Sequence, residues 1–190
     1  ISLTNHSKER RVAVPNGLLY KSTIDDEYKN VFGAINKVCR ANRGSGNNVL
    51  IGNERHVRVL ELTPDEYDLR APTGVNGHLC TTNHYLSPPM MKHQAERKPK
   101  YPPDIPENYF TVKWSEERLA YAQNWAEKIY PQAFSNTLAT TTQLLVNQFS
   151  YYFPLANQAT ICTTVFDLAR RKLHFYIPKT KEELTVPIEF

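Results

Sequence analysis

The residues best suited to chemistry lie in "HLCTTNHYLSPPMM", residues 78–91, where polar side chains follow a strand-like run. Asn83 and His84 come directly after "LCTT" and shortly before a double proline. Many layered folds gather their polar working groups at strand ends, because a rigid sheet holds side chains in a fixed direction. The pattern therefore indicates a candidate site, although asparagine and proline are also ordinary turn residues and a simple turn is the alternative.

Thiol and imidazole side chains are scattered along the chain. The three cysteines, Cys39, Cys80 and Cys162, show no C-x-x-C spacing, which disfavours a disulfide framework and structural zinc. Cys39 and Cys162 fall in apolar patterns and are interpreted as buried small hydrophobes, and nothing marks Cys80 as a nucleophile. His78 and His84 have a weak ligand spacing, so surface or hydrogen-bonded histidines are the better interpretation. We predict no metal site and no cofactor.

Strands and helices follow one another in blocks, which predicts an α+β fold and not a doubly wound parallel sheet. In the first half of the chain, periodicity and turn residues predict a helix over 25–43, a hairpin over 49–62 that turns at Gly52–Asn53, and short strands at 67–71 and 78–82. In the second half, they predict helices over 113–130 and 135–149, a hairpin over 159–177 and an edge strand over 184–190.

The helix over 113–130 is the one expected to accompany the candidate site. Ser115 is predicted to cap its N-terminus, with two glutamates in the first turn. Its buried stripe is predicted to consist of Leu119, Ala122, Ala126 and Ile129. Between the site and this helix, residues 87–108 form a Pro-rich and locally basic loop. A solvated loop is the simpler interpretation of its charges, and contact with an anionic ligand is the alternative.

Composition limits the classes of function. The chain has 190 residues, 41% of them hydrophobic, which suits a single globular domain over residues 1–190. A net charge of +4 without a long basic face does not indicate nucleic-acid binding. No apolar run is long enough for a membrane span. Asn5-His6-Ser7 fits a glycosylation sequon, which matters only in a secreted or lysosome-like compartment.

Three stretches together resemble one family. "NNVLIGNERHVRVLEL" followed by "GHLCTTNHYLSP" is similar to the segment of the linear-amide hydrolases in which a hairpin leads to a T-N-[HSY] strand end. "SEERLAYA" resembles the S-x-x-R helix start of that family, and "TICTTVFDLARRKLHFYI" resembles its closing hairpin. These are N-terminal-nucleophile enzymes, which include choloylglycine hydrolase, penicillin V acylase, acid ceramidase and the isopenicillin N acyltransferases. The resemblance covers most of residues 30–178.

The resemblance implies a four-layer αββα sandwich and cleavage or transfer at a carbon–nitrogen amide bond. Asn83 matches the asparagine that helps to form the oxyanion hole, and Arg118 matches an arginine that supports the nucleophile's surroundings. A surface arginine is the alternative interpretation of Arg118. His84, Tyr85 and Met90 are predicted to contact the substrate, a small-molecule amide or acyl compound, with ordinary loop packing as the alternative.

The family's mature catalytic chain begins with a cysteine, whose thiol is the nucleophile and whose α-amino group is the base. This sequence begins with Ile1, which can serve as neither. We therefore expect a fold that is incomplete without an N-terminal segment, and a complementary polypeptide that carries the cysteine. Exposed sheet edges would otherwise favour aggregation. The alternative is a catalytically inactive interaction domain that has kept the fold and lost the chemistry.

Overall fold

The computed structural model describes residues 2–4, 8–26, 28, 30–53, 55–73, 77–95, 112–128, 163–167, 171–177, 180 and 182–188. The chain divides into two compact units, Ile1–Glu127 and Lys128–Phe190. The described elements are helices and small antiparallel sheets, so the predicted α+β class is confirmed. Four layers, and a single domain over residues 1–190, stay predictions.

The first unit is built on a four-stranded antiparallel sheet. Its elements in chain order are β1 (Ser2–Thr4), α1 (Asn16–Asp25), α2 (Val31–Arg40), β2 (Asn47–Gly52), β3 (Val57–Leu62), β4 (Tyr67–Arg70), α3 (Pro88–Met91) and α4 (Val112–Lys128). The strand order is β1-β2-β3-β4. The β2–β3 hairpin confirms the one predicted over 49–62, and β4 confirms the strand predicted at 67–71.

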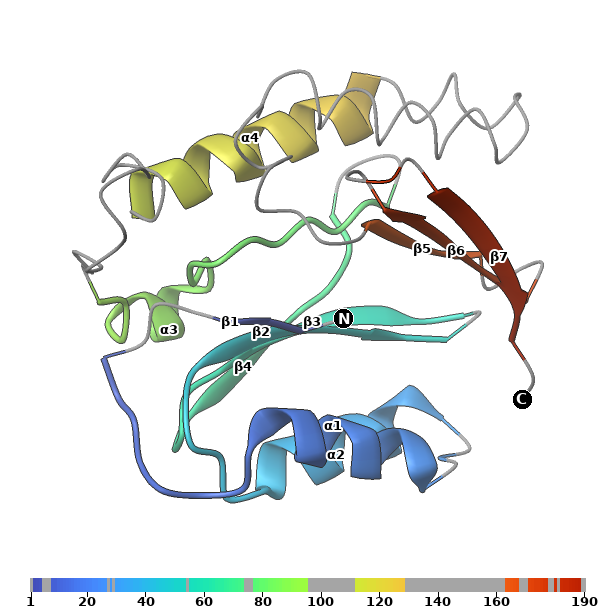
Figure 1. The fold of residues 1–190 in the computed structure, drawn as a ribbon. Helices are drawn as coiled ribbons and strands as arrows, with labels where there is room; N and C mark the ends of the chain where they lie inside the picture. Colours follow the sequence, from blue (N-terminus) through green and yellow to red (C-terminus); the bar gives the residue numbers. More distant parts are fainter. Residues whose placement is uncertain are drawn as a thin grey trace. The chain divides into compact units, whose positions relative to one another are not determined.

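One face of this sheet is covered by α1 and α2 (Figure 1). The buried apolar residues that form this core are Leu19 from α1, Val31, Ile35 and Val38 from α2, and Val49, Leu60 and Leu62 from the strands. The predicted helix over 25–43 is shorter than expected, because the Asn30 side chain caps α2 by accepting a hydrogen bond from Gly33 N at 3.0 Å. The helix α1 precedes it and was not predicted.

The opposite face of the sheet carries buried polar side chains as well as apolar ones. By strand alternation it carries Asn48, Val59 and Glu61, and residues 78–87 are attached to it through side chains. The prediction of a strand at 78–82 is wrong, because the Cys80 and Thr82 carbonyls accept hydrogen bonds from side chains and not from a neighbouring strand. Arg70 donates to the Cys80 carbonyl at 3.2 Å, and Asn48 donates to the Thr82 carbonyl at 2.8 Å.

The helix α4 begins at Val112, so the prediction that Ser115 caps it is wrong. Ser115 lies one turn inside the helix and is completely buried. Leu119 and Ala126 are buried as predicted. Ile129 and the helix predicted over 135–149 lie outside the described residues. No helix within the described ranges is long and apolar enough to cross a membrane.

The segment predicted as a loop over 87–108 contains a single helical turn. The short helix α3 forms at Pro88–Met91, where the Ser87 carbonyl accepts hydrogen bonds from Met90 N and Met91 N. Proline suits the first positions of a helix, because the hydrogen that its nitrogen lacks would have no partner there. Residues 96–108 of the predicted loop lie outside the described residues.

The second unit contains a three-stranded antiparallel sheet. Its strands are β5 (Thr163–Asp167), β6 (Lys172–Ile177) and β7 (Glu182–Pro187), in the order β5-β6-β7. The β5–β6 pair confirms the hairpin predicted over 159–177, and Arg171 takes a positive φ of 52° beside its turn. The strand β7 occupies an edge, as predicted from Pro187, since proline cannot donate to a neighbouring strand.

Candidate active site

Asn83 and Arg118 contact each other, although they lie 35 positions apart in the sequence. Nη2 of Arg118 donates a hydrogen bond to Oδ1 of Asn83 at 2.7 Å. This contact fixes the orientation of the amide, because the oxygen is the group that accepts and the NH₂ group must then face the other way. The two residues predicted to be catalytic therefore form one constellation.

Arg118 is not an ordinary surface arginine. Its residue is partly buried, and burial lowers the pKa of the Arg118 guanidinium from its usual 12.5 to about 10. A group with this pKa is still positively charged at neutral pH. Arg118 therefore offers a fixed positive charge beside the Asn83 side chain, in a partly dehydrated environment where its electrostatic effect is stronger than in water.

The backbone of Asn83 is held by the same helix. Asn83 N donates to Oγ of Ser115 at 2.8 Å. Ser115 and Arg118 are three residues apart on α4, so they project from one side of the helix. In the S-x-x-R motif of this chain, the serine thus binds the backbone of Asn83 and the arginine binds its side chain.

His84 belongs to the same buried network. Ser115 Oγ donates to Thr82 Oγ1 at 3.0 Å, and Thr82 Oγ1 in turn donates to the Ser115 carbonyl at 3.0 Å. Nδ1 of His84 lies 2.8 Å from Ser115 Oγ, whose proton is already used, so we infer that Nδ1 carries a hydrogen and donates. Burial lowers the pKa of His84, which keeps the imidazole neutral at physiological pH.

Glu61 fixes the residues that follow the site. Its side chain is completely buried and accepts hydrogen bonds from Leu86 N at 2.9 Å, Ser87 N at 2.9 Å and Ser87 Oγ at 3.0 Å. Arg70 completes the set with a 2.6 Å ion pair from its Nε atom. A buried carboxylate of this kind is stable only when its oxygens are paired in this way.

Sequence reasoning missed the contributions of Asn48, Glu61 and Ser115. Asn48 and Glu61 could have been noticed by one feature of the sequence, because each is a polar residue in a mostly apolar strand. Ser115 gave a misleading signal, because serine before glutamates at the start of a helix is typical of a cap.

Residues 5–182 match the family model described as acyl-coenzyme A:6-aminopenicillanic acid acyl-transferase. The chain belongs to this acyltransferase family. Membership confirms the predicted resemblance to the N-terminal-nucleophile linear-amide hydrolases and supports an acyltransferase or hydrolase-like enzyme function. No curated protein sequence matches the chain.

In this acyltransferase-family chain, the residues predicted to contact the substrate are buried. His84 is 4% exposed, Tyr85 2% and Met90 0%. The Tyr85 hydroxyl donates to the Leu62 carbonyl at 2.7 Å, and Tyr85 N donates to the Gln94 side chain at 2.9 Å. These contacts tie the segment after Asn83 to the sheet and to the end of α3. That His84, Tyr85 and Met90 line an acyl pocket stays a prediction.

The described cysteines of this family member lack thiolate character. Burial raises the pKa of both Cys39 and Cys80, and both thiols are free. Cys39 packs against the core between the helices and the sheet, as predicted. Cys162 lies outside the described residues. Within the described ranges, no group of three or more histidine, cysteine or acidic residues could hold a metal ion.

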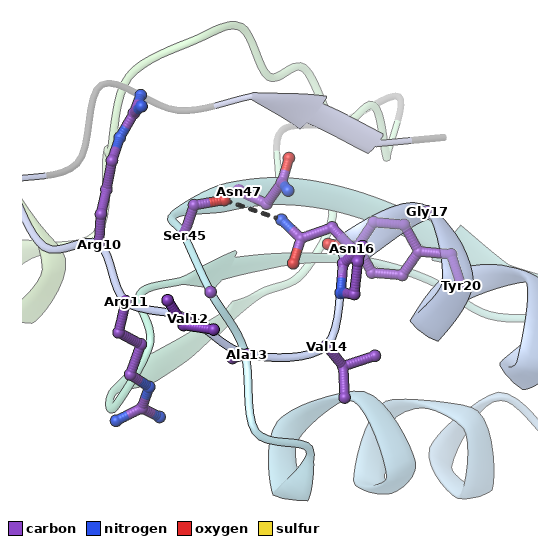
Figure 2. A pocket seen from close by; sticks show the side chains of 12 residues that line it. Arg10, Arg11, Val12, Ala13, Val14, Asn16, Gly17, Tyr20, Ser45 and Asn47 are labelled. Carbon is purple, nitrogen blue, oxygen red and sulfur yellow. Dashed lines mark hydrogen bonds between the residues drawn. The ribbon is translucent and has the colours of Figure 1, made fainter.

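Figure 2 shows a separate pocket. It is lined by residues 10–17 together with Tyr20, Gly44, Ser45 and Asn47, and Asn16 donates to Ser45 Oγ at 3.2 Å. Asn83 and Arg118 are not among its lining residues. We therefore do not place the acyltransferase chemistry in this pocket.

Proposed function

We propose that this chain carries the oxyanion-binding part of a cysteine-dependent active site, which hydrolyses or transfers the acyl group of a non-peptide linear amide. The supporting observation is the Asn83 amide, whose oxygen accepts from Arg118 while its backbone N–H is bound by Ser115. This leaves the direction of the NH₂ group fixed before any substrate arrives. Donors that need no reorganisation are the ones that stabilise a developing oxyanion best.

The proposed chemistry begins when the cysteine thiol gives its proton to the general base and attacks the acyl carbon of the substrate as a thiolate. A sulfur–carbon bond forms, and the carbonyl oxygen becomes an oxyanion that accepts a hydrogen bond from Nδ2 of Asn83. When the intermediate collapses, the carbon–nitrogen bond breaks, the amine leaves with a proton from the general base, and a thioester remains on the enzyme. Water then completes hydrolysis, or an acceptor amine completes transfer. A transferase that runs from an acyl thioester such as an acyl-CoA would release the donor's thiol instead.

We propose that the nucleophile comes from a complementary N-terminal polypeptide and not from Cys39 or Cys80. The raised pKa of both thiols argues against either as the attacking group, since the thiolate is the reactive form. In the family that this chain resembles, a cysteine at a free N-terminus supplies both the thiol and the base. The positive charge of Arg118 would polarise the Asn83 amide, and the polarised amide would stabilise the oxyanion in the same site.

The test is Asn83→Ala in the complete protein, including the segment with the nucleophile. We expect kcat to fall about 100- to 1000-fold, with little change in KM, because one oxyanion donor is lost. Steady-state turnover of an amide or acyl thioester substrate measures this. Asn36→Ala is the matched control, because Asn36 is exposed on α2 and should keep wild-type turnover. Near wild-type kcat in Asn83→Ala would remove Asn83 from the oxyanion site.

A second candidate, an inactive interaction domain with the same fold, is favoured by one observation, namely the raised pKa of both described thiols. Mass spectrometry of the complete protein after incubation with an acyl thioester separates the two candidates. An acyl adduct on a cysteine at a new N-terminus supports the enzyme. A full-length protein that has no such cysteine and forms no adduct supports the interaction domain.

A further inference from the structure

Two adjacent asparagines on β2, Asn47 and Asn48, are both buried, with 4% and 0% of their surface exposed. Successive residues of a strand point to opposite faces of its sheet. Asn47 shares its face with Val49 of the helix-covered core and lines the separate pocket (Figure 2). Asn48 therefore points to the polar face, where the candidate active site lies.

The Asn48 side chain contacts the residues on both sides of Asn83. Its Nδ2 atom donates to the Thr82 carbonyl at 2.8 Å and to the His84 carbonyl at 2.8 Å. These are the carbonyls of the residues immediately before and after Asn83. Both hydrogens of one side-chain amide are thus used to hold the two residues that flank the proposed oxyanion donor.

We propose that Asn48 is a positioning residue, which fixes the place from which Asn83 donates its hydrogen bond; this rests on the proposed function of Asn83. Ser115 and Arg118 bind Asn83 from the helix α4, and Asn48 binds the carbonyls of its two neighbours, Thr82 and His84, from the sheet. Asn83 is therefore held between two rigid elements. Such support matters for rate, because a displacement of about 1 Å can reduce catalysis about 100-fold.

Asparagine is the residue that this position requires. An alanine would leave two buried carbonyls without a donor, and a glutamine would place its amide one methylene further from the strand. An aspartate would set a negative oxygen against two carbonyl oxygens. Asn48 joins β2 to the residues on both sides of Asn83. The role is one of geometry, since Asn48 has its hydrogens committed to the backbone and none for the substrate.

The experiment is a double-mutant cycle in the complete protein with its nucleophile segment. Asn48→Ala is introduced into the wild type and into Asn83→Ala, and kcat and KM are measured at a temperature where all variants are folded. In the wild-type background we expect kcat to fall about 10- to 100-fold, with KM within about twofold. In the Asn83→Ala background we expect a further loss of less than about twofold, because Asn48 acts through Asn83.

Asn47→Ala is the matched control, because it removes the same side chain from the next position of β2 on the opposite face. It should leave kcat within about twofold of wild type, because its side chain faces the helix-covered side of the sheet and not the side on which residues 78–87 lie. If Asn48→Ala does not fold, Asn48→Ser, which keeps one donor and a small volume, replaces it in the cycle. Circular dichroism and thermal unfolding establish that each variant compared is folded.

Each outcome decides one question. Equal fold losses from Asn48→Ala in both backgrounds would overturn the positioning role, because they would show an effect independent of Asn83. An Asn48→Ala loss that appears in KM and not in kcat would overturn it as well. A wild-type kcat in Asn83→Ala alone would instead defeat the proposed function, so the two failures cannot be confused. A loss confined to the wild-type background supports the inference.

Discussion

The central strands β2 and β3 bury residues on both faces of the sheet, but the two faces bury different chemistry. On β3, Leu60 points to α1 and α2, and the adjacent Glu61 points to residues 78–87; both are 0% exposed. The same alternation separates Asn48 from Val49 on β2. One face is thus an apolar core, and the other carries buried polar side chains, Asn48 and Glu61, that bind backbone groups of residues 82–87.

This difference separates stability from positioning. Apolar burial is non-directional and roughly proportional to area, so the helix face can hold α1 and α2 without fixing any single atom. Hydrogen bonds have narrow distance and angle preferences, and an unpaired buried partner is costly. The polar face therefore determines where residues 78–87, and with them Asn83, lie relative to the sheet.

The largest effect is expected from Glu61→Gln on the polar face. Removing the charge leaves Arg70 without its carboxylate and disturbs the bonds to Leu86 N and Ser87 N. We expect the free energy of unfolding to fall by about 4 kcal/mol, as for other broken buried pairs, and kcat to fall with it. Chemical denaturation and turnover measure both quantities.

The matched control is Glu66→Gln, which removes the same charge at the exposed end of the β3–β4 turn. Glu66 pairs with Lys92 on the surface, where water screens the pair, so its loss should leave the free energy of unfolding close to that of the wild type. Similar destabilisation by both variants would contradict the view that the polar face depends on Glu61.

A smaller effect, and one limited to stability, is expected from Leu60→Ala on the helix face. The substitution removes part of the core beside Val49 and Leu62 and should lower the free energy of unfolding by about 3 kcal/mol. Because the Leu60 side chain packs in the core on the helix face, kcat per folded molecule should stay at the wild-type value. A large fall in kcat at temperatures where Leu60→Ala is folded would show that the two faces are not separate.

Local periodicity predicted the elements whose structure is decided locally. The β2–β3 hairpin, α2, α4 and the β5–β6 hairpin all follow patterns of apolar residues and turns. The helix α1 was missed, because its apolar residues do not form a consistent stripe. The strand expected at 78–82 was wrong, because side chains from distant strands bind its backbone there.

The site was predictable only in part. The motifs pointed to Asn83 and Arg118, and the structure brings these two side chains into contact. The partners of Asn48 and Glu61 were not predictable, since alternation along a strand tells which face a residue occupies but not what lies opposite. Their backbone partners in residues 82–87 lie more than 20 positions away. Ser115 was misread because the start of a helix cannot be located to within one turn from propensity.

The smallest expected effect concerns pH. Burial, the largest influence, lowers the pKa of His84 below its usual 6.5, so the unfolded chain binds a proton at His84 more readily than the folded one. The contribution of His84 to stability is therefore present above pH 6.5 and is lost as the pH falls from 6.5 through the lowered folded pKa.

The stability of His84→Gln should fall less steeply than that of the wild type between about pH 7 and 5, a window that follows from the ordinary histidine pKa. Urea titrations at several pH values measure this slope, with the exposed His56→Gln as a control that should follow the wild type. Parallel curves for His84→Gln and wild type would mean that the imidazole in the Ser115 network is not held neutral by burial, and the polar face would then tolerate a charge beside Asn83.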